Sequence, residues 1–170
     1  MLKADIKNDI ENRLSCLINQ PLSSFGRAGN LLWAGFGDKL IKKSIVYKEI
    51  SNLVSRYSLN VSCAWRLLHS GEIFTADYDF YVTKDNTINW DIVGNNRFDE
   101  RRDLLLESIE SKKICVRKIE SDFIGGVKIF FDEEFILEIF PNDSLREEYW
   151  RFFERVPNEG DDNPHFVVYG

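Results

Sequence analysis

The stretch from Val127 to Phe153 constrains the fold of this chain more than any other. It reads as two strands joined by an acidic turn, followed by a proline-containing loop and a third strand. Apolar residues alternate along the first two strands, and further apolar residues occupy the opposite face, at Phe130, Ile136 and Phe140. Strands that are apolar on both faces are typical of the centre of a sheet. We therefore expect this stretch to form the core of the fold.

The rest of the chain predicts two helices and several short strands. Apolar residues recur at helical spacing over residues 3–19 and over Phe98–Ser111, where Asn96 is a suitable N-cap. Alternating patterns predict further strands, at residues 30–36, 58–69, 72–82, 114–120, 147–154 and 165–169. Residues 38–57 fit a helix and an edge strand about equally well. We expect an α+β fold over residues 1–170: a single domain with an antiparallel sheet of about seven or eight strands and two helices packed on it.

Charge and cysteine usage limit the classes of partner. The net charge is −6 with no long basic run, which argues against binding nucleic acid and favours a basic protein partner. No apolar run reaches the length of a membrane helix, and the N-terminus lacks the apolar segment of a secretory signal. The three cysteines are far apart, at Cys16, Cys63 and Cys115, which is typical of a reducing compartment. We expect a cytoplasmic protein.

No motif demands catalysis, a metal or a cofactor. The two histidines, His69 and His165, have no metal-binding spacing, and no serine nucleophile motif is present. Asp77 and Asp79 fall on one face of the expected strand 72–82, where they are either an acid–base pair or part of a solvated face. A small hydrolase that uses Asp77, Asp79 or His165 is therefore the weakest of three alternatives. We predict no catalytic residue, no metal and no cofactor.

Arginines within aromatic segments suggest a second alternative, a module that binds an anionic small molecule or peptide. The candidates are Arg27, Arg66, Arg151, Trp65 and Trp150. For Arg27, which lies between two glycines, the competing interpretation is a structural arginine bonded to an acid or to carbonyl groups inside the fold. For the tryptophans, which also include Trp33 and Trp90, the competing interpretation is that they belong to the core.

Several ordered motifs resemble a family of small bacterial proteins of uncharacterised activity. The motifs are GRAGNLLWAGFG (26–37), CAWR (63–66), NWDIVGNNRFDE (89–100), LEIFPNDS (137–144), EEYWRFFE (147–154) and PHFVV (164–168). The resemblance implies a small, single-domain, cytoplasmic protein. Small proteins of this general kind often act as immunity proteins, which neutralise bacterial toxins by direct binding.

An immunity-type binding protein is therefore the leading hypothesis. Acidic proteins bind basic toxins quickly and tightly through complementary fields. The expected contact residues are the acids of the C-terminal loops: Asp132, Glu133, Glu134, Asp143, Glu147, Glu148, Glu159, Asp161 and Asp162.

Overall fold

The structure is a computed structural model that describes residues 3–43, 51–84, 89–156 and 164–170. It is an α+β fold in which ten strands form two antiparallel five-stranded sheets. The first sheet has the order β1-β2-β3-β9-β10, made of β1 (Leu22–Ala28), β2 (Leu31–Lys43), β3 (Ser51–Val61), β9 (Glu148–Glu154) and β10 (Phe166–Tyr169). The second has the order β5-β4-β8-β7-β6, made of β5 (Glu72–Ala76), β4 (Trp65–His69), β8 (Phe135–Ile139), β7 (Val127–Phe131) and β6 (Val116–Ser121).

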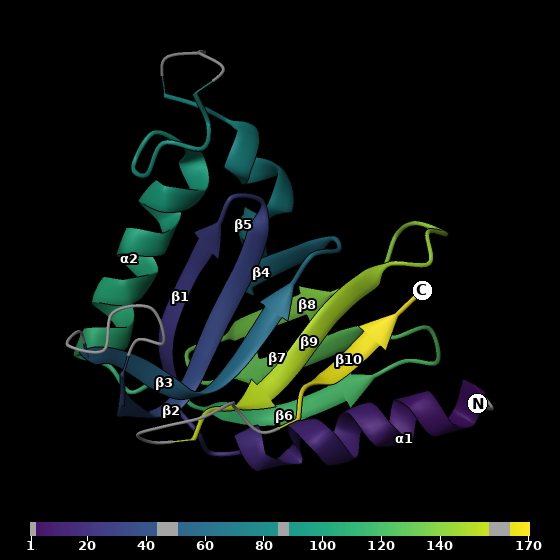
Figure 1. The fold of residues 1–170 in the computed structure, drawn as a ribbon. Coiled ribbons are helices and arrows are strands. Elements are labelled where there is room, and N and C mark those ends of the chain that lie inside the picture. Colours follow the sequence, from purple (N-terminus) through teal and green to yellow (C-terminus); the bar gives the residue numbers. More distant parts are fainter. Residues whose placement is uncertain (1–2, 44–50, 85–88, 157–163) are drawn as a thin grey trace.

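The two sheets lie one behind the other and bury their facing sides (Figure 1). Side chains from both sheets and both helices form one apolar cluster between them. The predicted hairpin is confirmed, because β7 and β8 are interior strands of the second sheet. The third strand of that stretch, β9, lies in the first sheet instead. The 127–153 stretch thus supplies core residues to both layers.

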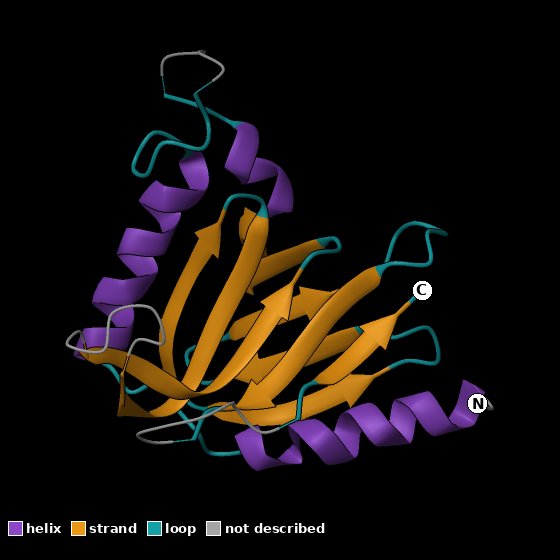
Figure 2. Ribbon diagram, viewed as in Figure 1, coloured by secondary structure: helices purple, strands orange, loops and turns teal. Residues whose placement is uncertain are grey.

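Two helices pack at the sides of the sheets (Figure 2). Helix α1 (Lys3–Leu14) continues into a short 3-10 turn (Ser15–Leu17) and contacts β6. Helix α2 (Arg97–Ser111) contacts β1 and β5. The predicted N-cap of α2 is confirmed, since the Asn96 side chain accepts a hydrogen bond of 2.8 Å from the backbone N–H of Asp99.

The single strand expected at residues 58–69 is two strands that belong to different sheets. β3 ends at Val61, the chain turns at residues 62–64, and β4 begins at Trp65. The alternation continues through the turn because Leu59 in one sheet and Leu67 in the other both face the shared core. Periodicity identifies the buried face of a strand, but it does not reveal the corner at which the chain changes sheet.

Other differences concern segments with weak strand patterns. Residues 22–28, which lie outside the expected strands, form β1, and β2 extends beyond its expected end at residue 36 to Lys43. The ambiguous region is strand on either side of residues 44–50, which lie outside the described residues. The strand expected at 72–82 ends at Ala76, and a 3-10 helix, η2, covers Asp77–Tyr81. The strands outnumber the expected seven or eight because these segments pair despite their serines and glycines, and they form two sheets of five in place of one.

Candidate protein-binding surface

The structure does not bring the predicted arginines and tryptophans into one site. Trp65 and Trp150 are 1% and 0% exposed and belong to the core. Their neighbours Arg66 and Arg151 point away from the core, because successive side chains of a strand face opposite sides of the sheet. Arg66 is in the second sheet and Arg151 in the first. The predicted anion site formed by these five residues is therefore wrong.

Each of the three guanidinium groups has a carboxylate partner within the protein. Arg66 pairs with Glu138 and Arg151 with Glu148. Arg27 is buried beside Asp99, with two hydrogen bonds of 3.0 and 3.1 Å to its carboxylate. The interpretation of Arg27 as a structural residue is confirmed.

Asp99 is the centre of the network that holds α2 against β1. It is 0% exposed and also accepts a hydrogen bond of 2.7 Å from the backbone N–H of Gly94. Burial alone would raise its pKa, but the hydrogen bonds from Arg27 and Gly94 and the charges of Arg27 and Arg102 hold the pKa below its usual range. Asp99 is therefore ionised at neutral pH.

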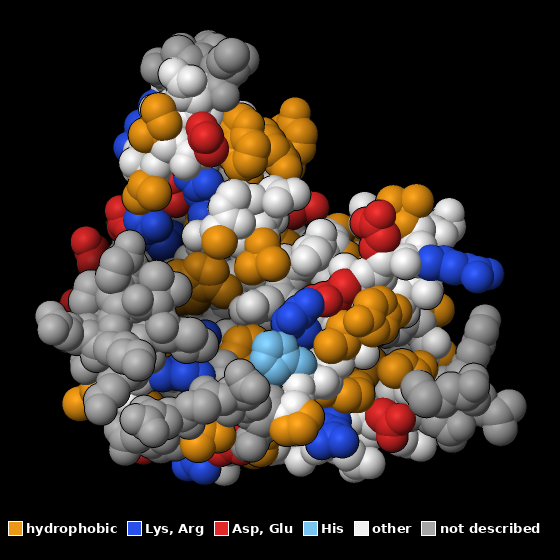
Figure 3. Space-filling model, in the orientation of Figure 1, with side chains coloured by type: hydrophobic (Ala, Val, Ile, Leu, Met, Phe, Trp, Pro, Cys, Tyr) orange, Lys and Arg blue, Asp and Glu red, His pale blue; other side chains and the backbone are white. Residues whose placement is uncertain are grey.

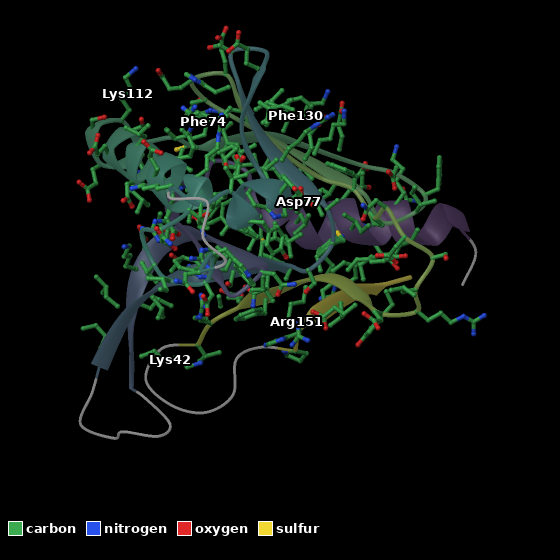
Figure 4. The ribbon with its side chains drawn as sticks, turned by 90° about the horizontal axis from the view of Figure 1, so that it is seen from above. Lys42, Phe74, Asp77, Lys112, Phe130 and Arg151 are labelled. Carbon is green, nitrogen blue, oxygen red and sulfur yellow. The ribbon has the colours of Figure 1, made fainter. Side chains whose placement is uncertain are left out.

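The residues proposed for hydrolysis do not form an acid–base site. Asp79 accepts hydrogen bonds from the Thr75 hydroxyl and the Ala76 N–H, and Asp77 accepts one from the Tyr78 N–H. Both acids lie in η2 rather than on a strand face, which corrects the predicted pairing. His165 stacks on Phe153 in the first sheet, with ring centroids 4.1 Å apart. Arg151, which contacts His165, lies away from Asp77 in Figure 4.

The acidic hairpin tip is largely neutralised by neighbouring cations. Asp132 pairs with Arg117 and Glu133 with Lys112, both at 2.5 Å. Glu134 accepts a hydrogen bond of 2.8 Å from the Ser70 hydroxyl. These partners come from β6, the end of α2 and the β4–β5 turn. The tip therefore stabilises the junction of three elements, and its charge is largely offset there.

The second acidic group lies in the loop before β9. Asp143 and Glu147 are exposed, whereas Glu148 pairs with Arg151. The remaining predicted contact residues, Glu159, Asp161 and Asp162, lie outside the described residues.

A hollow of about 650 Å³ lies beside this loop, and we call it the C-terminal hollow. Its lining is mostly apolar and includes one charged residue, the acid Asp143, among the residues that the structure describes. Three large apolar side chains around it are strongly exposed: Phe123 (55%), Ile124 (64%) and Tyr169 (63%). The lining residues are Ile6, Phe123, Ile124, Gly125, Pro141, Asp143, Tyr149, Val168, Tyr169 and Gly170. Figure 3 shows hydrophobic side chains exposed on the side of the molecule where the C-terminus lies.

Hydrogen bonds fix both turns that border the C-terminal hollow. Asp122 accepts bonds of 2.9 and 2.8 Å from the backbone N–H groups of Ile124 and Gly126. The buried Trp150 indole donates a bond of 2.7 Å to the Gly125 carbonyl. On the other side, the Tyr149 hydroxyl donates a bond of 3.0 Å to the Asp143 carbonyl. The exposed apolar side chains therefore stand on fixed backbone.

Sequence reasoning identified Asp143 but missed Phe123, Ile124 and Tyr169. The sequence does contain a signal for Phe123 and Ile124. This apolar pair lies directly before Gly125-Gly126, a turn signal, where no strand face is available to bury its side chains. Tyr169 looked like an ordinary strand residue. Only the packing of β10 at the sheet edge exposes it.

Comparisons with known proteins leave the function open. No protein-family model, curated protein or solved structure matches the chain. The resemblance of the motifs to small bacterial proteins therefore stays a prediction. Within the described residues, no group of three or more potential metal ligands comes together. The described helices are also all too short or too polar to span a bilayer.

Proposed function

We propose that this chain is a binding protein of the immunity type, which neutralises a bacterial toxin by direct contact through the C-terminal hollow. The observation that supports it is the combination of an apolar hollow with exposed Phe123, Ile124 and Tyr169 around it. Exposed apolar side chains that cluster around a concave surface are typical of protein interfaces. The toxin class rests on the resemblance of the motifs.

Charge favours a basic partner. Asp143 lines the hollow, Glu147 lies exposed in the same loop, and the whole chain carries a net charge of −6. Burial and then the nearby Asp143 carboxylate raise the pKa of Tyr149, so its hydroxyl stays protonated and keeps its bond to the loop. A basic protein that inserts an apolar side chain beside Tyr169 would satisfy both the charge and the shape of this surface.

The proposal replaces most of the predicted acidic contact surface. Asp132, Glu133 and Glu148 already have cationic partners within the chain, so a toxin would have to compete with those pairs. Asp143 and Glu147 remain the acids best placed to meet a partner.

The test is capture from a lysate of the native host at low salt, followed by affinity measurement with the purified captured protein. Phe123→Ser and Tyr169→Ser should each weaken binding by about tenfold or more, the effect of losing an interface anchor. The matched control is Ile73→Ser, because Ile73 is 59% exposed on β5 and does not line the hollow.

A charge reversal tests the electrostatic part. Asp143→Lys should weaken binding most at low salt, whereas Glu72→Lys, an exposed acid on β5, should not. Equal binding by wild type and all hollow variants would overturn the proposal. Thermal unfolding of each variant confirms that it is folded.

A further inference from the structure

A groove crosses the outer face of the first sheet, independent of the C-terminal hollow. It consists of two hollows of about 510 and 470 Å³ that share the lining residues Ser24, Trp33 and Lys39. One half lies towards α2, and the other lies over β2 and β3. We call the whole the Trp33 groove. Hydrophobic side chains lie recessed over β1 and β2 on this face in Figure 3.

The sheet is built to hold the Trp33 indole close against its outer face. Leu32 and Ala34 are fully buried on the inner side, so Trp33 between them points outward. Its cross-strand partner is Gly26, where an added Cβ would lie only 2.3 Å from the indole Cζ2. Only glycine at this position lets the ring lie directly on the backbone of β1. The indole is half-buried, which leaves part of it open to the groove.

A second glycine makes room for a fixed cluster of hydroxyl groups. A Cβ on Gly35 would lie 2.2 Å from the Ser24 hydroxyl and 2.3 Å from the Ser55 hydroxyl. The Ser55 hydroxyl lies 2.7 Å from that of Ser24 and accepts a bond of 2.8 Å from that of Ser23. These side chains are therefore oriented before any ligand arrives.

The half of the groove over β3 is cationic. Its described charged lining residues are Lys39 and Arg155, and no carboxylate lines it among the residues that the structure describes. Arg155 donates to the Ser55 carbonyl at 2.9 Å and to the Ser58 hydroxyl at 3.3 Å, which fixes its guanidinium against the sheet. In the other half the charged lining residues near α2 are of both signs, Glu110 and Lys113. A cationic site on a chain of net charge −6 attracts anions locally.

We infer that the Trp33 groove binds a small ligand that combines a flat ring with a negatively charged group. The ring stacks on the exposed part of the Trp33 indole, because flat π-systems pack well on an indole. The anionic group lies at the β3 half, where Lys39 and Arg155 supply charge-assisted hydrogen bonds. Phosphate and carboxylate share this chemistry.

The test follows the indole N–H signals of the four tryptophans by nuclear magnetic resonance, with the Trp33 signal assigned from Trp33→Phe. Adenosine monophosphate and benzoate are the two probes, and tighter binding of one assigns phosphate or carboxylate. We expect the Trp33 signal to move and those of the buried Trp65 and Trp150 to stay. Adenosine and inorganic phosphate, which each lack one half of the chemistry, should bind more weakly.

Two variants separate binding from folding. Lys39→Gln should weaken binding by about tenfold, the loss of one charge-assisted contact. Lys128→Gln, on the second sheet, is the matched control and should leave binding unchanged. Gly26→Ala should displace the indole and weaken binding as well.

The inference is overturned if the Trp33 signal does not move at millimolar concentrations of either probe. It is also overturned if inorganic phosphate or adenosine alone binds as tightly as adenosine monophosphate, or if Lys39→Gln and Lys128→Gln behave alike. None of these outcomes depends on the C-terminal hollow.

Discussion

The charged row on the second sheet and the groove over β3 on the first sheet use charge in opposite ways. On the second sheet, four neighbouring strands place Arg66, Glu138, Lys128 and Glu120 in one row of alternating sign. Glu138 lies 2.5 Å from Arg66 and 2.8 Å from Lys128. On the first sheet, the groove over β3 presents two cations and no described carboxylate. Phe130 and Arg151, which belong to these two outer faces, lie on opposite sides of the molecule in Figure 4.

The difference separates charges that are paired across strands from charges that line an open groove. A hollow of about 230 Å³ also lies over the second sheet and includes Arg66, Glu138 and Lys128. A ligand there would have to compete with ion pairs that are already formed across the strands. In the Trp33 groove no described lining carboxylate offers that competition near β3. Matching cross-strand pairs stabilise a sheet, whereas cations that line an open groove attract anions to it.

The largest effect should come from breaking the anchor that holds the edge of the first sheet. Asp99→Ala leaves the buried Arg27 guanidinium without its carboxylate, and we expect a loss of about 3–5 kcal/mol in the free energy of unfolding. Denaturant unfolding measures it. Hydrogen exchange should rise more in β1 than in β8, and equal increases in both would contradict a local anchor.

A smaller loss should follow from filling the backbone notch in the first sheet. Gly35→Ala places a methyl group within 2.2–2.6 Å of Ser24 and of Ser55, which is only 3% exposed. Overpacking of this kind costs about 1–3 kcal/mol. Gly26→Ala meets only the half-buried indole and should cost less, because the ring can move outward. A larger cost for Gly26→Ala in denaturant unfolding would contradict the packing described here.

Neutralising Glu138, at the centre of the charged row on the second sheet, should lower the free energy of unfolding by less than the glycine substitutions do. Glu138→Gln weakens contacts to both Arg66 and Lys128, but these cations are about half exposed, at 43% and 54% of their side chains. We expect a loss of about 1–2 kcal/mol at pH 7. Binding at the Trp33 groove should be unchanged in this variant.

The same variant should flatten the dependence of stability on pH. Burial alone would raise the pKa of Glu138, but hydrogen bonds from Lys128 and Arg66 lower it overall. A lowered carboxyl pKa contributes stability that is present above the unfolded value, about 4.3, and is lost as the pH falls through the folded value. Wild type should therefore lose more stability than Glu138→Gln between pH 7 and about pH 3. If the stability of the two proteins falls in parallel with pH, the ionised Glu138 does not stabilise the fold.

The smallest changes in the free energy of unfolding should come from replacing one exposed lysine on the outer face of each sheet. Lys128→Gln should cost up to about 1 kcal/mol, because it removes a pair with Glu138. Lys39→Gln should change the free energy of unfolding by less than about 0.5 kcal/mol, as is usual at an exposed site. A larger stability loss for Lys39→Gln would place that charge in the fold rather than in the groove.

The sequence predicted local features whose cause lies within a few residues. The hairpin of β7 and β8 follows from two alternating strands around an acidic turn, and α2 follows from its N-cap at Asn96 and its apolar stripe. In each case neighbouring residues alone specify the feature.

Contacts between distant residues could not be predicted in this way. Arg27 and Asp99 are 72 residues apart, and nothing local marks them as one buried pair. Nothing local marks Gly26 and Gly35 as positions within strands where Trp33, Ser24 and Ser55 occupy the space that a Cβ would need.

The sequence by itself determined an acidic α+β chain, the buried faces of its strands and the cap of α2. Only the tertiary structure decided that the alternation through residues 58–69 divides between two sheets. It also decided that exposed charges on the second sheet are paired across strands, whereas Lys39 and Arg155 on the first sheet line a groove. The physical reason is that periodicity records burial, whereas pairing and register between distant strands determine what each exposed side chain contacts.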